Sequence, residues 1–276
     1  MDSLIERAAR DLLNSSHAIA LTGAGMSTES GIPDFRGPNG IWTKNPDAER
    51  RAYETYHNFL RNPRGYWEDV LGGRSILGDL MSARPNRGHE ALVDLEEQGL
   101  LKAVLTQNID GLHVKAGNKR VLEYHGSVLK LRCPSCGSRY ERSEYDLQGM
   151  KEKDKLPPLC KRCSAAIKGD VVHFNEPIPS DVAHESMEEA LKCDLMLICG
   201  TSAVVYPFAQ LPRVARERRR TAETVTIIEV NAEPTPLTAE GISDYLIQGR
   251  TAEILPRIVE AISKMVRWGV THFLTQ

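Results

Sequence analysis

The sequence predicts an α/β fold in which a parallel sheet is covered by helices on both faces, with a cysteine-rich segment inserted between two of its strands. Short continuous apolar runs alternate with helix-like patterns along most of the chain. Such an alternation is typical of strands that are buried on both faces of a parallel sheet. Residues 128–178 lose this alternation and hold four of the six cysteines, so they are predicted to form a separate module.

The expected elements follow from apolar periodicity and from the residues that punctuate it. The predicted strands are 18–22, 103–106, 195–199, 225–230 and, more weakly, 245–247. The predicted helices are 4–13, about 88–99, 181–192, 207–220 and 251–267. Residues 31–45 are rich in glycine and proline and are predicted to form a long ordered loop, a kind of segment that is often functional.

Composition and charge narrow the class of protein. The 276 residues carry a net charge of −2, which does not suit a molecule that binds nucleic acid directly. No run approaches the roughly 20 apolar residues that a membrane span needs, and residues 1–7 do not resemble a signal peptide. We therefore expect a cytoplasmic protein without a membrane partner. The basic run from Arg213 to Arg220 is interpreted as the end of a helix complementing its own dipole.

Two Cys-x-x-Cys pairs form the strongest local motif: Cys133 with Cys136, and Cys160 with Cys163. Four thiolates in two such turns can surround one Zn²⁺ tetrahedrally, and a site closed by four cysteines is structural rather than catalytic. A redox pair or two disulfides are the alternatives, which a reducing compartment disfavours. Cys193 and Cys199 are interpreted as buried apolar residues.

Polar and glycine-rich clusters follow four of the predicted strands. They are Thr22-Gly23-Ala24-Gly25-Met26-Ser27, Gln107-Asn108-Ile109-Asp110, Gly200-Thr201-Ser202 and Asn231-Ala232-Glu233. The carboxyl ends of parallel strands share one sheet edge, so together the clusters predict a crevice for a large phosphate-bearing ligand. The first cluster is an incomplete dinucleotide fingerprint, because Thr28 replaces its third glycine. Taken singly, each cluster is also compatible with ordinary turn and capping chemistry.

His125 lies in Glu123-Tyr124-His125-Gly126, immediately before the cysteine-rich segment. A histidine has a pKa near neutrality and can act as a general base. A structural hydrogen-bonding role is the alternative, and His89 and His113 have an equal claim on residue type alone.

Taken in chain order, these motifs resemble the sirtuin family over about residues 5–260. The matching segments are Gly23-Ala24-Gly25-Met26-Ser27, Gly31-Ile32-Pro33-Asp34-Phe35-Arg36, Thr106-Gln107-Asn108-Ile109-Asp110-Gly111-Leu112-His113, Tyr124-His125-Gly126, the paired Cys-x-x-Cys turns, Gly200-Thr201-Ser202 and Val230-Asn231. A long colinear set is far more specific than any one of its motifs.

The resemblance implies a Rossmann-like NAD-binding domain (1–31, 84–127 and 179–276), a cofactor-binding loop with a helical module (32–83), and a zinc-binding module with a peptide-binding segment (128–178). It implies an NAD-dependent protein-lysine deacetylase or deacylase that releases nicotinamide and O-acyl-ADP-ribose. NAD would be the co-substrate and Zn²⁺ structural, and the partners would be acyl-lysine proteins, chromatin proteins among them. The protein itself would be a monomer.

Other functions fit the same motifs. A mono-ADP-ribosyltransferase would use the same NAD site, and a non-catalytic NAD-binding or zinc-ribbon interaction module would need no base. A hydride-transferring dehydrogenase ranks third, since the dinucleotide fingerprint is incomplete.

Residue roles are implied by the same resemblance. The catalytic residues would be His125, as general base, and Asn108. The cofactor-binding residues would be Gly23, Ala24, Gly25, Ser27, Asp34, Phe35, Arg36, Gln107, Asn108, Asp110, Gly200, Thr201, Ser202, Asn231 and Thr251. The acyl-lysine peptide would contact Ile109, Val172, His173, Phe174, Asn175 and Glu176, and the metal Cys133, Cys136, Cys160 and Cys163.

Two departures from the family pattern bear on the substrate. Asn175 stands where the peptide-binding segment usually has glycine, which leaves the peptide preference open. Val70 and Gly73 occupy the positions of a Tyr-x-x-Arg pair found in sirtuins that prefer acidic acyl groups. We therefore expect acetyl or longer apolar acyl groups to be preferred over succinyl or malonyl groups.

Overall fold

A six-stranded sheet forms the centre of the larger lobe. The computed structural model describes residues 1–37, 40–72, 80–218 and 225–273. The strand order is β3-β2-β1-β7-β8-β9, and every neighbouring pair is parallel. The strands are β1 (Ala18–Thr22), β2 (Leu101–Thr106), β3 (Val121–Glu123), β7 (Leu195–Cys199), β8 (Thr226–Asn231) and β9 (Tyr245–Gln248). The predicted parallel α/β fold is confirmed, and the reversal of strand order between β1 and β7 is where such sheets bind ligands.

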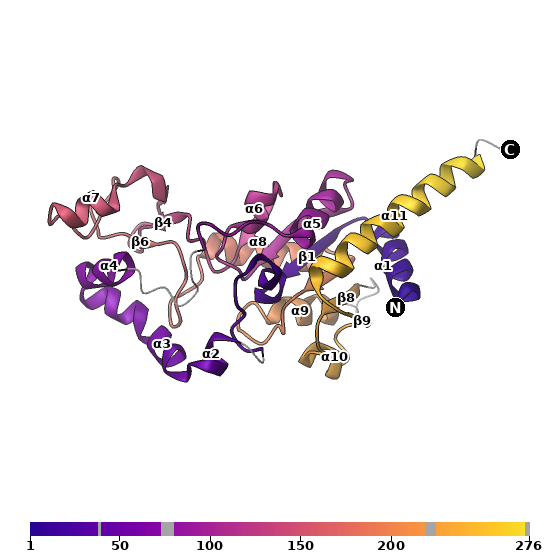
Figure 1. The fold of residues 1–276 in the computed structure, drawn as a ribbon, viewed down its shortest axis with the longest axis horizontal. Helices are drawn as coiled ribbons and strands as arrows, with labels where there is room; N and C mark the ends of the chain where they lie inside the picture. Colours follow the sequence, from indigo (N-terminus) through magenta and orange to yellow (C-terminus); the bar gives the residue numbers. More distant parts are fainter. Residues whose placement is uncertain (38–39, 73–79, 219–224, 274–276) are drawn as a thin grey trace.

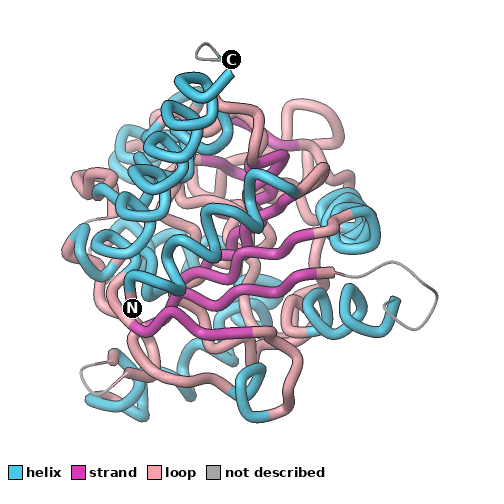
Figure 2. Tube along the Cα trace, turned by 90° about the vertical axis from the view of Figure 1, so that its right-hand side faces the viewer, coloured by secondary structure: helices cyan, strands magenta, loops and turns pink. Residues whose placement is uncertain are grey.

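Helices cover both faces of this sheet (Figures 1 and 2). One face packs against α1 (Asp2–Asn14), α5 (Arg87–Glu97) and α11 (Thr251–Phe273), through a core that includes Leu12, Leu92 and Ile258. The other face packs against α8 (Ser180–Lys192), α9 (Gln210–Arg218) and α10 (Pro236–Ala239). Side chains of β1 alternate between the two cores, so every one of its residues is buried and the strand reads as continuously apolar.

Some elements differ from the sequence predictions. The strand β3 and the short helix α6 (Leu112–Ala116) were not expected, because three and five residues are too few to show a period. The predicted helix 207–220 begins at Gln210, and its last two residues lie outside the described part of the chain. Arg213 and Arg216 do more than complement a dipole, since they bind Glu240 and Asp244.

The smaller lobe lies at the opposite end of the molecule from the C-terminal helix (Figure 1). Its helices are α2 (Ile41–Lys44), which falls inside the predicted loop 31–45, and α3 (Pro46–Arg61) and α4 (Pro63–Leu71). Asn45 and Asn62 cap α3 and α4, and a proline occupies the first position of each helix, a typical arrangement for helix starts.

The cysteine-rich segment forms a three-stranded antiparallel sheet in the order β5-β4-β6. Its elements are β4 (Lys130–Arg132), β5 (Arg139–Glu141), η3 (Arg142–Glu144), α7 (Leu147–Glu152) and β6 (Lys168–Gly169). Trp67 of α4 is fully buried against this sheet, and its indole Nε1 donates to the carbonyl of Ile167 at 2.7 Å. The helices and the cysteine-rich segment therefore share one apolar core. The residue limits of the three predicted domains remain predictions.

None of the helices in the described part of the chain is both long and apolar enough to cross a membrane.

Candidate active site

A cleft of about 1730 Å³ lies where the carboxyl edge of the large sheet meets the smaller lobe. Its wall on the sheet side comes from the loops that follow β1, β2, β7 and β8, and the wall on the other side from α3, α4 and residues 171–178. The cleft is large enough for a dinucleotide and for the end of a peptide side chain, since small-molecule sites usually span about 300–1,000 Å³.

The loop after β1 contains the glycine turn. It continues into two short 3₁₀ helices, η1 (Ala24–Met26) and η2 (Thr28–Ser30), and not into the α-helix expected after such a turn. A Cβ on Gly25 would lie 2.9 Å from Cα of Gly200, and one on Gly23 would lie 2.6 Å from Cβ of Thr201. These glycines are therefore required by the close approach of the β1 and β7 loops to each other.

Asn108 belongs to a buried polar network at the end of β2. Its amide nitrogen donates to the carbonyl of Gly23 and to Oγ of Ser27, each at 3.0 Å. Ser27 in turn donates to Asp110 at 2.7 Å, and burial raises the pKa of that carboxyl group. Because both amide hydrogens of Asn108 are used, the group it can offer a ligand is its Oδ1 acceptor.

Gln107 connects two of the loops around the cleft. Its amide nitrogen donates to Oγ1 of Thr201 at 2.7 Å, and the same hydroxyl accepts the backbone N–H of Ala203 at 3.1 Å. The loops after β2 and β7 are thus held together on the floor of the cleft.

His125 lines the cleft and is partly buried. Its Nδ1 lies 3.1 Å from the carbonyl oxygen of Gln107. A carbonyl oxygen only accepts, so Nδ1 carries the hydrogen and Nε2 is left with the lone pair that a base needs. Burial lowers the pKa of His125, which keeps the imidazole neutral near pH 7.

His89 and His113 do not line the cleft. Both are buried, and burial lowers the pKa of each. Their ring centroids lie 4.8 Å apart with the planes tilted by 56°, and Nε2 of His113 lies 2.9 Å from Oγ1 of Thr22. His89 and His113 are therefore buried away from the cleft, and of the three candidate histidines His125 is the one that lines it.

Local hydrogen bonds tie together the loop that was predicted to bind the cofactor. The N–H of Gly37 donates to the carboxylate of Asp34 at 3.0 Å, and the N–H of Trp42 donates to the carbonyl of Phe35 at 3.0 Å. The rings of Phe35 and Trp42 lie 4.7 Å apart, and the Arg36 guanidinium lies 4.5 Å from the Trp42 ring centroid. Asp34, Phe35 and Arg36 all line the cleft.

Residues 171–176 run beside His125. The N–H of Val172 donates to the carbonyl of His125 at 2.8 Å. Gly126, at φ +72°, allows this approach, since a Cβ there would lie 2.1 Å from the carbonyl oxygen of Asp170. Asn175 has φ +64°, the left-handed region that glycine favours and asparagine tolerates, so it preserves the backbone conformation that a glycine would allow. Its amide also donates to the carbonyl of Tyr53 at 3.3 Å.

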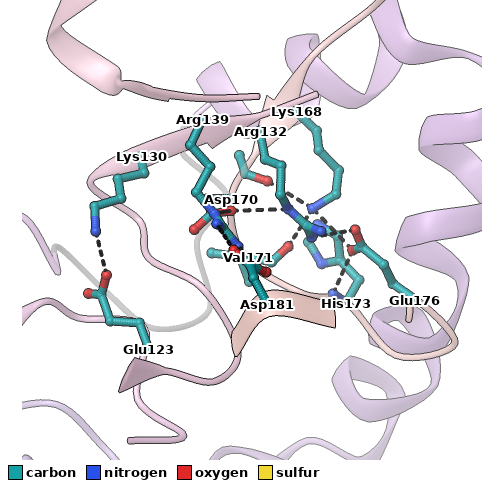
Figure 3. Close-up of polar contacts among 11 residues, drawn as sticks. Glu123, Lys130, Arg132, Arg139, Lys168, Asp170, Val171, His173, Glu176 and Asp181 are labelled. Atoms are coloured by element: carbon teal, nitrogen blue, oxygen red, sulfur yellow. Dashed lines mark hydrogen bonds and ion pairs between the residues drawn. The ribbon is translucent and has the colours of Figure 1, made fainter. Parts of the chain in front are cut away.

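An ion cluster behind this segment was not found from the sequence (Figure 3). The Glu176 carboxylate accepts from Arg132 at 2.7 Å and from the backbone of His173 at 3.0 Å, and it pairs with Lys168 at 3.1 Å. Lys168 is fully buried and also donates to the carbonyls of Gly169 at 2.8 Å and Val171 at 2.5 Å. Burial lowers the pKa of Lys168 to about 8, with Glu176 acting in the opposite direction. The cluster fixes the turn that carries the predicted peptide-binding residues.

The four predicted metal ligands come together away from the cleft. The Sγ atoms of Cys133, Cys136, Cys160 and Cys163 all lie within 4.8 Å of one another, with Cys133 and Cys163 3.5 Å apart and Cys136 and Cys160 3.6 Å apart. A tetrahedral Zn²⁺ with bonds of about 2.3 Å requires sulfurs about 3.8 Å apart. The residues present therefore fit zinc, and a site closed by four thiolates gives it a structural role. Cys193 and Cys199 are fully buried, one in each of the two cores of the large sheet, as expected.

All predicted cofactor-binding and peptide-binding residues except Gly23 line the cleft. Gly23 lies beneath it, where its carbonyl holds Asn108. Asn231 donates its amide to the carbonyl of Glu233 at 2.9 Å, and Thr251 is buried near Gly25. Val70 also lines the cleft, whereas Gly73 lies outside the described residues.

The cleft also has walls that sequence reasoning missed. Tyr66 and Trp67 come from α4, and Phe174, which also lines the cleft, stacks on Tyr53 of α3 at 4.3 Å. The asparagine–proline helix starts at residues 45–46 and 62–63 could have revealed those helices. Nothing in the sequence separates Lys168 from the exposed lysines at 153 and 155.

The fold and the cleft define an α/β protein built to hold a dinucleotide against an extended peptide, with a neutral imidazole between them. The model of the Sir2 family matches residues 23–207, and the chain belongs to this family.

The comparisons also identify similar individual proteins. NAD-dependent protein deacylase 2 of Archaeoglobus fulgidus is 43% identical over 96% of this chain and 98% of its own length. NAD-dependent protein deacylase 2 of Pyrobaculum aerophilum is 40% identical over 93% of this chain and 96% of its own. A solved structure of Sir2 with a p53 peptide and NAD⁺ is 32% identical, has a TM-score of 0.73, and matches 93% of this chain and 97% of that one.

Proposed function

We propose that this protein is an NAD-dependent protein-lysine deacylase that passes the acyl group of a modified lysine to ADP-ribose. The observation that carries the proposal is the position of His125, which lines one cleft with the strand-end loops and adjoins residues 171–176. Its hydrogen bond to Gln107 leaves Nε2 as the basic nitrogen. The products would be free lysine, nicotinamide and O-acyl-ADP-ribose.

The similar proteins support the choice of substrates. Both curated relatives are NAD-dependent protein deacylases, and the solved Sir2 structure holds a peptide together with NAD⁺. In this chain the loops after β1, β2, β7 and β8 would bind NAD, and residues 171–176 would bind the acyl-lysine peptide. The four-cysteine site would hold one structural Zn²⁺.

NAD, when bound, supplies the anomeric carbon to which the acyl oxygen bonds as nicotinamide leaves. Nε2 of His125 would then accept a proton from a ribose hydroxyl, which allows that hydroxyl to attack the acyl carbon. The lysine amine would leave as its bond to that carbon breaks, and the addition of one water molecule would leave a hydroxyl on the anomeric carbon of the product. Oδ1 of Asn108 would hold a ribose hydroxyl or a water in place. The aromatic pair of Phe35 and Trp42 would keep bulk water from the reacting sugar.

The proposal also covers the substrates, the oligomeric state and the cellular location of the protein. We expect protein substrates carrying acyl-lysine, chromatin proteins among them, a monomeric enzyme, and a cytoplasmic location. The reduced state of a four-cysteine zinc site is consistent with that compartment.

Incubation with NAD and a panel of acyl-lysine peptides tests the function directly. We expect the peptide mass to fall by one acyl group for each nicotinamide released. A gain of ADP-ribose on the peptide would identify a mono-ADP-ribosyltransferase instead. Reduced-nicotinamide absorbance without free nicotinamide would identify a dehydrogenase, and binding of NAD without any product would identify a non-catalytic module.

A further inference from the structure

Glu229 is a buried acidic residue that the proposed reaction does not use. It lies in β8 and has no exposed surface. Side chains of β8 alternate between the two cores of the large sheet: Ile227 lies in the core beside α8 and α9, and Ile228 in the core beside α1 and α11. The same alternation places Glu229 on the side of Ile227, where packing favours an apolar residue. A carboxylate at this position therefore needs a reason other than packing.

Three hydroxyl groups from one segment surround the Glu229 carboxylate. Oγ1 of Thr238 donates to one of its oxygens at 2.6 Å, Oγ of Ser243 donates to the same oxygen at 2.5 Å, and Oγ1 of Thr235 donates to the other. The two threonine hydroxyls also accept backbone N–H groups, that of Thr235 at 3.3 Å and that of Leu237 at 3.1 Å, so their own hydrogens point to the carboxylate. These bonds fasten α10 and the residues on both sides of it to β8.

No cation pairs with Glu229 within the described ranges of the chain. The arginines of α9 that reach this segment, Arg213 and Arg216, pair with Glu240 and Asp244 instead. A buried carboxylate without a cation is costly, and hydrogen bonds from neutral groups offset only part of that cost. Since stability alone would favour an apolar residue here, the carboxylate is better explained by what its hydroxyl partners hold in place.

The hydroxyl network holds one end of the loop that follows β8. Residues 231–236 line the cleft, and Thr235, near the end of this loop, donates to Glu229. The start of the loop is held by β9, where Nε2 of Gln248 donates to the carbonyl of Ala232 at 2.9 Å. Glu229 is fully buried and does not line the cleft itself, so it can act on a ligand only through this loop.

The loop lies far along the sheet from the proposed reaction centre. His125 follows β3, and β2, β1 and β7 separate β3 from β8. Neighbouring strands lie about 4.8 Å apart, so the two places on the sheet edge are roughly 19 Å apart. A dinucleotide whose reacting ribose lies at His125 would therefore place its adenosine half at residues 231–236.

We propose that Glu229 is a positioning residue for NAD, which acts through its hydroxyl partners to hold residues 231–236 in the conformation that binds the adenosine half. The proposal rests on the NAD-dependent function proposed above. A loop that is already held in its binding conformation loses less conformational entropy when the ligand binds, so it binds more tightly without any new contact. Because substrate and transition state share the adenosine half, a loosened loop should weaken the binding of both equally.

Two variants of the network test this role. Glu229→Gln removes the charge and one acceptor oxygen. The triple variant Glu229→Leu, Thr238→Val and Ser243→Ala replaces the acceptor and two donors together by apolar groups, an exchange that can leave the free energy of unfolding nearly unchanged. In both variants we expect KM for NAD to rise by about tenfold, the ratio that about 1.4 kcal/mol produces. At saturating NAD, kcat and KM for the acyl peptide should stay within about twofold of the wild type.

Competition by the two halves of NAD locates the effect within the ligand. The inhibition constant of AMP against NAD should rise together with KM, whereas that of nicotinamide mononucleotide should not, because only AMP carries adenosine. Glu189→Gln is the matched control, since Glu189 is an equally buried acid that pairs with His17 and Arg120 and does not line the cleft. It should leave KM for NAD and both inhibition constants unchanged, whatever its effect on the free energy of unfolding.

The two proposals fail in different ways. The role of Glu229 is refuted if the folded variants bind AMP as tightly as the wild type, or if both halves of NAD lose affinity equally. It is also refuted if Glu189→Gln raises KM for NAD by the same factor, because loss of any buried charge would then be sufficient. If the wild type binds AMP but releases no nicotinamide from NAD with any acyl peptide, the deacylase function fails, and calorimetric affinities for AMP still decide the role of Glu229.

Discussion

At the scale of single residues, burial and hydrogen bonding distinguish His125 from His89. His125 is partly buried at the edge of the cleft with one nitrogen left as an acceptor. His89 is completely buried at the start of α5, where its Nδ1 accepts the backbone N–H of Asn86 at 3.3 Å. Both are neutral near pH 7, but only His125 is placed to take a proton from a ligand.

The pH dependence of turnover follows from the lowered pKa of His125. The base must be neutral, so kcat/KM should fall on the acid side with a midpoint below 6.5, the ordinary value for histidine. His125→Asn should lower kcat by about 10²–10⁴-fold while NAD binding persists, because general-base catalysis contributes about that much. The measurement is a pH profile of deacylation with NAD affinity determined separately. An acid limb with a midpoint above 6.5 would contradict the assignment.

His89 makes a prediction about stability. Burial lowers its pKa to about 4, so below pH 6.5 the unfolded chain binds a proton that the folded protein does not. The free energy of unfolding should therefore be highest above pH 6.5 and should lose about 3 kcal/mol from this group as the pH falls to 4. Denaturant titrations across this range should show a shallower pH slope for His89→Gln than for the wild type. An equal slope in the two proteins would contradict the prediction.

At the scale of elements, the strands and helices of the large sheet could be predicted except for the short β3, α6 and α10, and the smaller lobe could be predicted only in part. Strands such as β7 are buried on both faces and therefore appear as uninterrupted apolar runs. The ion cluster around Glu176 could not be foreseen, because its members are brought together by the pairing of β4 with β6. Arg132 and Lys168 are register partners in that pairing, although 36 positions separate them in the chain.

The ion cluster around Glu176 should hold residues 171–176 in one conformation. Lys168→Met leaves the Glu176 carboxylate buried with one cation fewer, which should destabilise the protein by roughly 3–5 kcal/mol. Adding Glu176→Gln removes the unbalanced charge and should restore part of that loss. Hydrogen exchange of residues 168–176 and denaturant unfolding of both single variants and the double variant measure the coupling. Additive effects of the two substitutions would show that the two side chains do not act together.

In both single variants, Lys168→Met and Glu176→Gln, turnover should fall because the acyl peptide binds less tightly. We expect KM for the acyl peptide to rise while the affinity for NAD changes little, because the NAD loops come from the opposite wall of the cleft. A parallel loss of NAD affinity would indicate general misfolding instead of displacement of the peptide-binding segment.

At the scale of the whole molecule, the cleft lies where the large sheet meets the smaller lobe. The loops after β1, β2, β7 and β8 are anchored in the large sheet with its two cores, whereas α3, α4 and the cysteine-rich segment share a separate core. The residues to which the sirtuin resemblance assigns cofactor and peptide contacts all line the cleft, with Gly23 as the exception. The sequence could not predict that Trp67 joins the helices to the zinc-binding module, since this contact spans 100 positions.

Loss of zinc should therefore destabilise α3 and α4 as well as the zinc-binding module. Metal analysis should find about one Zn²⁺ per chain, and Cys133→Ser or Cys160→Ser should release it. Because Cys133 and Cys160 are part of the core that holds Phe59 and Trp67, hydrogen exchange should rise in α3 and α4 as well as around the cysteines. Deacylation should fall with it, while α1, α5 and β7 stay protected. Cys193→Ala, in the core of the large sheet, is the matched control and should keep its zinc. Unchanged exchange in α3 and α4 after complete zinc loss would mean that the helices are held in place without the metal site.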